Sequence, residues 1–275
     1  MYMTYPAMMI GDQDMFCALQ ELKKYGGIAG VHCENAGVID ARIAELKAAG
    51  RAADVSAHPE ARPDYLEAEA VARLLRIAEA ADAPVVIVHL TNREALDEVA
   101  FARARGQRVY VETCPQYLVL DGSRYDAPGF KGAKYVCSPP LRSLDDQAAL
   151  WEAIRNGEID SISTDHCSYN YAGQKDLGQN DFSKIPNGLP GIEHRPAAVY
   201  TAGVAAGRMT ENQMAALLSE HTARLFGMYP RKGAISVGGD ADIVVWDPAA
   251  RWTISAETQH QNCDYTPYEL SLIHI

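Results

Sequence analysis

Short apolar runs alternate with amphipathic stretches from about residue 14 to 165. The clearest run, 85–89, follows a proline and holds four β-branched residues in a row, which is typical of a buried strand. Between the runs, apolar residues return every three or four positions, which predicts helices. Strands alternating with helices predict an α/β fold with a parallel sheet. We expect strands at 28–32, 85–89, 109–112 and 159–165, and helices at 14–25, 39–49, 63–81, 95–105 and 145–156.

The pattern changes in the last third of the chain. Residues 168–191 show no periodicity, and a long irregular loop in a compact domain is usually functional. Helices are predicted at 195–206 and 211–226. Short apolar runs at 233–237, 241–246 and 251–255, separated by turn residues, then predict a small antiparallel β module beside the main domain.

Composition narrows the class of protein. The 275 residues are 48% hydrophobic and 22% charged, which excludes a disordered or low-complexity chain. About 250 residues is typical of a complete eight-stranded β/α barrel, so the length alone suggests an intact barrel. The formal net charge is −11 without a basic stripe, which argues against nucleic acid or an anionic membrane surface as a partner.

Export signals and membrane spans are not predicted. The longest aliphatic run, 85–88, is far shorter than the ~20 residues that cross a bilayer. The N-terminus carries neither a positive n-region nor a small-residue cleavage site. Six cysteines without a CxxC pair are expected to be reduced thiols. We therefore expect a cytoplasmic protein.

Three predicted strands end in a side chain that can bind a metal, namely His32, His89 and Asp165. Catalytic residues of α/β folds stand at the carboxyl ends of parallel strands. One histidine there is more often a hydrogen-bonded core residue, but three such residues on three strands favour a shared site. Neutral imidazole and carboxylate are ligands that Zn²⁺ accepts, and an aspartate beside a metal-bound water can move its proton.

Six motifs, in order along the chain, closely resemble the dihydropyrimidinase and D-hydantoinase family of the amidohydrolase superfamily. The resemblance extends from residue 1 to about residue 270. The motifs are His32–Asn35, Glu112–Leu118, Lys134–Arg142, Thr164–Cys167, Lys184–Gly188 and Gly239–Val244.

The resemblance implies a zinc-dependent hydrolase, because the site of that family holds two zinc ions bridged by a carboxylated lysine and a hydroxide. His32 and His89 match the ligands of one zinc, and Asp165 matches the ligand of the other, which is also the general base. Tyr5 matches a tyrosine that polarises the substrate carbonyl. The backbones of Ser138 and Asn187 match groups that bind the cyclic ureide or imide. The family opens dihydropyrimidines or hydantoins to N-carbamoyl amino acids, as homotetramers.

The chain departs from this family in three respects. No two of its eight histidines form the His-x-His pair of the first barrel strand. The bridging lysine would stand just before Met1, so we expect this chain to begin one residue after it. Four barrel strands are predicted instead of eight. The expected fold is therefore the C-terminal half of a (β/α)₈ TIM-type barrel, strands 5–8, over residues 1–230, with part of a β-sandwich at 231–270 and an unrelated tail at 271–275.

Other assignments remain open. With only part of the ligand set, the 275-residue chain is expected to be inactive alone. An allantoinase-like or dihydroorotase-like hydrolase, which has the same kind of metal site, is an alternative enzyme. The Ser-Pro-Pro and Pro-Asn-Gly segments favour the dihydropyrimidinase branch over it. A non-catalytic dihydropyrimidinase-related scaffold is the rival from another class, and retention of His32, His89 and Asp165 speaks against it.

Further polar residues near the motifs have supporting roles at most. His166 is expected to position a ligand residue instead of binding metal. Glu34 and Glu112 are either structural carboxylates or acceptors that orient the metal ligands. Four cysteines are expected to be small buried thiols, namely Cys33, Cys114, Cys137 and Cys167. Three histidines are expected to be structural or solvated, namely His58, His194 and His221.

Overall fold

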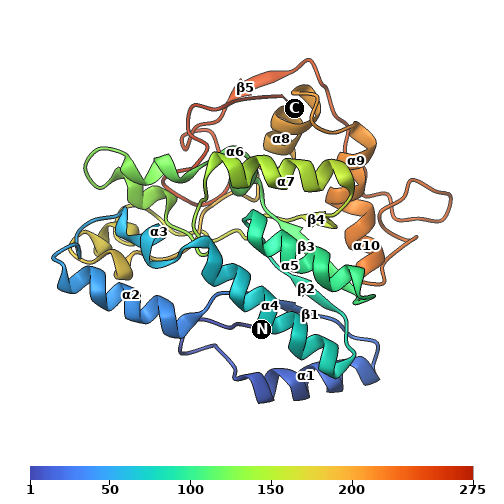
Figure 1. Ribbon diagram of the computed structural model, residues 1–275. Coiled ribbons are helices and arrows are strands. Elements are labelled where there is room, and N and C mark those ends of the chain that lie inside the picture. The colour runs from blue at the N-terminus through green and yellow to red at the C-terminus, as the bar shows by residue number, and fades with distance from the viewer. Residues whose placement is uncertain (275) are drawn as a thin grey trace.

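A four-stranded parallel sheet forms the centre of the computed structural model, which describes residues 1–274 (Figure 1). The strands lie in the order β1-β2-β3-β4, so each one pairs with its neighbour along the chain. Their carboxyl ends consequently meet at one edge. The bounds are β1 Ala29–Val31, β2 Val85–Ile87, β3 Val109–Thr113 and β4 Ser161–Ile162.

The long helices lie between the strands, as the periodicity predicted. They are α1 Asp12–Lys24, α2 Ala36–Ala48, α4 Asp64–Ala81, α5 Arg93–Ala104 and α7 Leu144–Asn156. Most begin up to three residues before the predicted start, because a capping side chain lies upstream of the apolar stripe. Asn35 caps α2, Asn92 caps α5 and Ser143 forms a capping box at α7. α4 and α5 pack together and cover β2 and β3 (Figure 1).

Short helical segments fill the connections that carry no clear period. A single helical turn is too short for apolar periodicity to reveal it, which is why these segments were not predicted. They are α3 Ala57–Ala61, α6 Pro115–Val119 and the 3-10 helices Gly122–Asp126, Lys131–Tyr135, Lys175–Gly178 and Phe182–Lys184.

The two later helices are confirmed, but each contains a wider, π-helical segment. The first is α8 Arg195–Val199, which continues as a π-helix over Tyr200–Ala205. The second comprises α9 Glu211–Ala215, a π-helix at Ala216–Glu220 and α10 His221–Leu225.

The prediction of a three-stranded β module is wrong for two of its strands. Residues 233–237 and 241–246 adopt no strand structure, because no described segment offers a backbone with which they pair. Ile235 and Val245 are 91% and 93% exposed, so this apolar segment lies on the surface. Only the third stretch forms a strand, β5 Arg251–Thr253, which pairs with β6 Leu272–His274 in antiparallel orientation.

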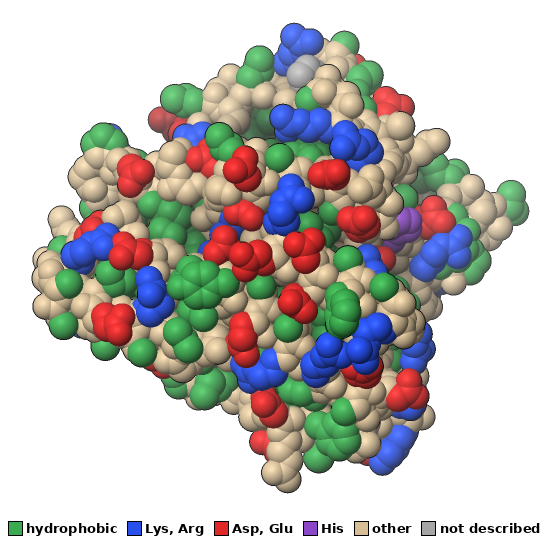
Figure 2. All heavy atoms as spheres, viewed as in Figure 1, with side chains coloured by type: hydrophobic (Ala, Val, Ile, Leu, Met, Phe, Trp, Pro, Cys, Tyr) green, Lys and Arg blue, Asp and Glu red, His purple; other side chains and the backbone are tan. Residues whose placement is uncertain are grey.

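Acidic and basic side chains are intermixed over the face that carries the long helices (Figure 2). Some of these charges join helices, as Arg73 on α4 does by pairing with both Asp12 of α1 and Glu69. Exposed pairs of this kind contribute little to stability. None of the described helices is both long and apolar enough to cross a lipid bilayer.

Candidate active site

A cavity of about 570 Å³ opens at the carboxyl edge of the sheet. Its walls come from the ends of β1 and β2, from β3, from the segment after β4 and from the first residues of the chain. All of the residues that the sequence nominated for metal, catalysis or substrate line this one cavity. They are Tyr5, His32, His89, Ser138, Asp165 and Asn187.

The backbone is unusual at three of these residues. Tyr5, His89 and Asp165 adopt left-handed conformations, with φ of 64°, 43° and 45°. Residues other than glycine rarely adopt this backbone conformation, and each such residue costs the fold about 1–3 kcal/mol of free energy. Only Asp82 and Leu270 share it among the other non-glycine residues that the structure describes. Such strain gathers at functional sites, which supports assigning a function to the cavity.

The two candidate metal ligands of β1 and β2 approach each other closely. The His32 and His89 rings are 4.5 Å apart between centroids and both are buried. His32 Nε2 is 2.6 Å from Oε2 of Glu34, while the buried Nδ1 of His89 has no hydrogen-bond partner among the described residues. Burial lowers the pKa of His89 to about 3, which keeps its imidazole in the neutral form that binds metals.

Two carboxyl groups face the same space. Burial raises the pKa of Asp165, and the nearby His32 counters part of that rise. Burial also raises the pKa of Glu112, whose Oε1 accepts a hydrogen bond of 2.6 Å from Ser163 Oγ. A carboxyl group with a raised pKa is suited to accept and return a proton near neutral pH.

The donor set fits zinc in type but falls short in number. Two imidazoles and a carboxylate are zinc ligands, and the unpaired His89 Nδ1 is available for coordination. However, the described residues contain no group of three His, Cys, Asp or Glu side chains arranged to hold a metal ion. A catalytic zinc normally takes three protein ligands. The described residues therefore supply part of a metal centre and do not close it.

A separate wall of the cavity carries Tyr5, Ser138 and Asn187. The side chains of Ser138 and Asn187 lie beside the phenol of Tyr5 and partly offset the burial that raises the pKa of Tyr5 above its usual range. The phenol consequently remains protonated and can donate a hydrogen bond. The segments around these residues are joined through their backbones, since Gly188 N–H donates to the Val136 carbonyl at 3.1 Å. Gly188 also has a φ of 135°, and a Cβ there would lie 2.4 Å from Cys167 Cβ.

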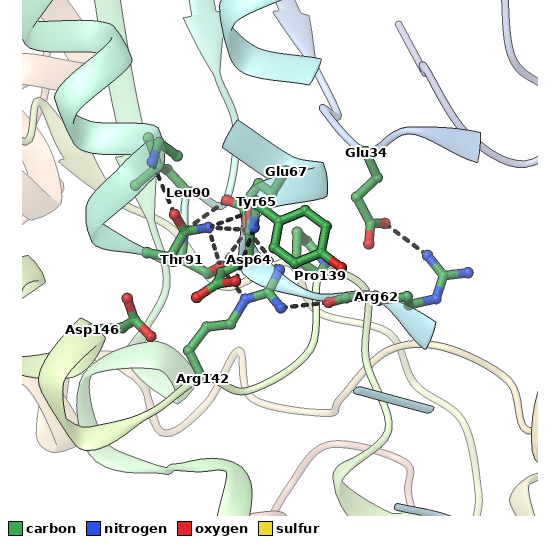
Figure 3. A network of polar contacts seen from close by, with 12 residues as sticks. Glu34, Arg62, Asp64, Tyr65, Glu67, Leu90, Thr91, Pro139, Arg142 and Asp146 are labelled. Atoms are coloured by element: carbon green, nitrogen blue, oxygen red, sulfur yellow. Dashed lines mark hydrogen bonds and ion pairs between the residues drawn. The ribbon is translucent and has the colours of Figure 1, made fainter. Parts of the chain in front are cut away.

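Glu34, the partner of His32, belongs to a buried polar network that the sequence did not reveal (Figure 3). Glu34 Oε2 accepts a hydrogen bond of 3.0 Å from Arg62, whose carbonyl accepts one of 2.5 Å from Arg142. Arg142 also pairs with Glu67 at 3.0 Å, and Glu67 accepts the backbone N–H of Thr91 at 2.9 Å. The network links the segments after β1 and β2 to the segment that carries Ser138. Arg142 ends a family motif, which was the available signal, whereas Glu67 lies beside the apolar stripe of α4 and gave none.

The family model of the amidohydrolase family matches residues 1–270. The chain belongs to the amidohydrolase family. The motif resemblance to its D-hydantoinase branch is confirmed by relatives: the D-hydantoinase of Streptomyces coelicolor is 44% identical over 98% of this chain, and that of Rhizobium radiobacter is 45% identical over 98%. The chain spans 57% and 58% of the length of these two relatives.

Solved structures agree with the sequence comparison. Dihydropyrimidinase from Brevibacillus agri superimposes with a TM-score of 0.97 at 44% identity, covering 99% of this chain and 59% of that one. L-Hydantoinase from Arthrobacter aurescens superimposes with a TM-score of 0.90 at 30% identity, covering 99% and 60%. This amidohydrolase chain therefore shares its α/β fold with the solved structures of a dihydropyrimidinase and of an L-hydantoinase.

Four further histidines of the amidohydrolase chain, His58, His166, His194 and His221, do not line the cavity. His166 Nδ1 accepts the N–H groups of Gly191 and Ile192 at 3.1 and 3.3 Å, so it holds the loop after β4. His58 is buried and its Nε2 bonds the Cys137 carbonyl at 2.8 Å. His194 and His221 bond Gln259 Oε1 and the Asp160 carbonyl.

The cysteines near the cavity are poor nucleophiles. Burial raises the pKa of Cys137 to about 12 and that of Cys167 to about 11, and it raises the pKa of Cys33 and Cys114 as well. A thiol attacks as its thiolate, which is scarce at neutral pH under these conditions.

Replacing His58 with Gln is expected to reduce the dependence of the free energy of unfolding on pH below about pH 6.5. Burial lowers the pKa of His58 to about 3 from 6.5, so the folded chain stays neutral at this site while the unfolded chain takes up a proton. Stability is therefore complete above pH 6.5 and declines below it, by up to about 1.4 kcal/mol per pH unit from this residue. Urea unfolding at pH 7 and pH 5 measures the slope. An unchanged slope in His58→Gln, with His221→Gln as the control, would refute the assignment.

Proposed function

We propose that this chain supplies the catalytic cavity of a zinc-dependent hydrolase that opens the cyclic amide bond of dihydropyrimidines or hydantoins to N-carbamoyl amino acids. The observation that carries the proposal is the convergence of His32, His89, Asp165 and Tyr5 on one cavity, with strained backbone at three of them. The named functions of the relatives, D-hydantoinase and dihydropyrimidinase, favour this branch of the family over allantoinase-like chemistry.

Two zinc ions, when bound, would polarise the amide carbonyl and activate water. His32 and His89 would hold one ion and Asp165 would contact the other, with further ligands coming from outside the described residues. The Asp165 carboxylate would accept the proton of the attacking water and return it to the leaving ring nitrogen.

The opposite wall would bind and orient the ring. The Tyr5 phenol, kept protonated by burial, would donate to the carbonyl oxygen as negative charge develops on it. Backbone groups of Ser138 and Asn187 would pair with the ureide or imide edge. A cavity of about 570 Å³ is within the usual 300–1,000 Å³ range of small-molecule sites.

The wider architecture is part of the same proposal. We propose that the four parallel strands are strands 5–8 of a (β/α)₈ barrel over residues 1–230, that 231–270 contribute to a β-sandwich, and that 271–275 stand outside the family pattern. The exposed apolar segment 233–245 agrees with a missing sheet partner. A homotetrameric, cytoplasmic parent protein is the expected context.

Zinc binding tests the metal assignment directly. The 275-residue chain is expected to bind no more than one zinc ion and to show no turnover of dihydrouracil, because the described residues do not close a three-ligand site. Loss of a residue that only supports a metal ligand weakens binding about 10–100-fold. His89→Ala removes a ligand itself and should weaken zinc binding by more than that. Zinc per chain is measured after equilibrium dialysis, with His221→Ala as the control. Two bound zinc ions with turnover, or equal binding by the two variants, would contradict the assignment.

A further inference from the structure

Lys175 lies in the irregular loop after β4 and is completely buried. Its Nζ donates to the backbone carbonyls of Val136 at 2.7 Å and Pro186 at 2.9 Å. No carboxylate pairs with this ammonium among the residues that the structure describes. An unpaired buried ammonium is expensive, and burial lowers the pKa of Lys175 to about 7. Packing alone therefore does not explain why a lysine occupies this buried position.

The two acceptor carbonyls lie beside the substrate wall. Val136 is two residues before Ser138, and Pro186 directly precedes Asn187. The Val136 carbonyl also accepts the Gly188 N–H, so Lys175 and this backbone bond join the same two segments. Ser138 and Asn187 both contact the cavity and flank the Tyr5 phenol. Two cross-links, the Lys175 ammonium and the Gly188 backbone bond, therefore tie together the segments that carry these two residues.

A different lysine of the same region shows the contrast. Lys47 on α2 reaches Asp181 at 2.8 Å, just before the 3-10 helix Phe182–Lys184, and Ser183 within that helix at 2.6 Å. It is partly exposed, pairs with a carboxylate and touches neither substrate segment. An ordinary surface ion pair accounts for Lys47 but not for Lys175.

We propose that Lys175 is a positioning residue that fixes the spacing of Ser138 and Asn187, and that it thereby sets the affinity of this wall for the ureide or imide edge of a cyclic substrate. The ligand class rests on the proposed function, whereas the cross-link does not. Lys175 touches no reacting atom in this scheme and acts through the two backbone segments.

Lys175→Met removes the ammonium and keeps an unbranched apolar side chain as far as the ε carbon. We expect amide hydrogen exchange at Ser138, Asn187 and Gly188 to accelerate at least 10-fold, with little change in the thermal midpoint, because an apolar side chain suits a buried site. Dihydrouracil affinity should fall about 10-fold in the same variant. Lys47→Met should change neither the exchange at these amides nor the affinity.

The outcomes separate the two proposals. Unchanged exchange at the three amides in Lys175→Met would overturn the positioning role. Faster exchange with unchanged dihydrouracil affinity, in a chain that binds this probe, would also overturn it, since a purely structural role predicts that result. Faster exchange in a chain that never binds dihydrouracil would support the cross-link, overturn its substrate role and count against the proposed function. If Lys175→Met does not fold, Lys175→Gln, whose side chain is shorter and uncharged, gives the same comparison.

Discussion

Replacing Glu34 with Gln is expected to weaken zinc binding about 10–100-fold and to destabilise the fold by about 3–5 kcal/mol. Glu34 is 1% exposed, and its Oε2 contacts both His32 Nε2 at 2.6 Å and Arg62 at 3.0 Å. Burial opposes ionisation, but Arg62 and His32 hold the pKa of Glu34 below its usual range. An ionised carboxylate on Nε2 fixes the proton there and leaves Nδ1 of His32 free for a metal.

The two effects of Glu34→Gln have separate causes. Loss of charge leaves the Arg62 guanidinium buried without a counter-charge, which accounts for the fall in the free energy of unfolding. Glutamine keeps one acceptor oxygen but can turn its NH2 group toward His32 Nε2, so the orientation and tautomer of His32 are no longer fixed, which accounts for the weaker zinc binding. Adding Arg62→Met should therefore restore part of the stability without restoring zinc affinity.

Urea unfolding and zinc titration measure these two effects side by side. Glu69→Gln is the matched control, because Glu69 is a partly exposed carboxylate that contacts Asn35 and Arg73 away from the cavity. Equal behaviour of Glu34→Gln and Glu69→Gln in both measurements would rule out the role assigned to Glu34.

The parallel sheet and the location of the site could be predicted from sequence because both depend on local signals. A run such as 85–89 identifies a buried strand, and the residue that ends it, His89, then lies at the edge where parallel strands meet. The same reasoning placed Asp165 correctly on the cavity. Tyr5, Ser138 and Asn187 depended on the family resemblance, since no periodicity marks a loop residue as part of a site.

Features that depend on distant partners could not be predicted. The ion pair of Glu67 and Arg142 joins residues that are 75 positions apart, and neither residue type signals burial. The apolar segment 241–246 has the composition of a strand, but a strand also needs a hydrogen-bonding partner, and no described segment provides one. Composition predicts the preference of a segment, whereas its environment decides the outcome.

Asp165→Asn is expected to have the largest effect on catalysis, a loss of about 10²–10⁴-fold in hydrolysis. An amide cannot accept the water proton and is a weaker metal ligand than a carboxylate. The left-handed backbone at Asp165, with φ of 45°, aims its side chain into the cavity, and asparagine tolerates the same conformation. The fold should therefore survive the change, so that a loss of activity reports on chemistry.

The most direct measurement uses a chimera in which this chain replaces the matching 269-residue segment of the Streptomyces coelicolor D-hydantoinase. Initial rates of hydantoin and dihydrouracil ring opening are compared between this chimera and its Asp165→Asn variant, with zinc content and folding verified for both. The account predicts ring opening by the chimera and a loss of at least about 100-fold in the variant. A folded, zinc-loaded chimera that opens neither ring, or whose rate does not depend on Asp165, would contradict the account and favour a non-catalytic scaffold.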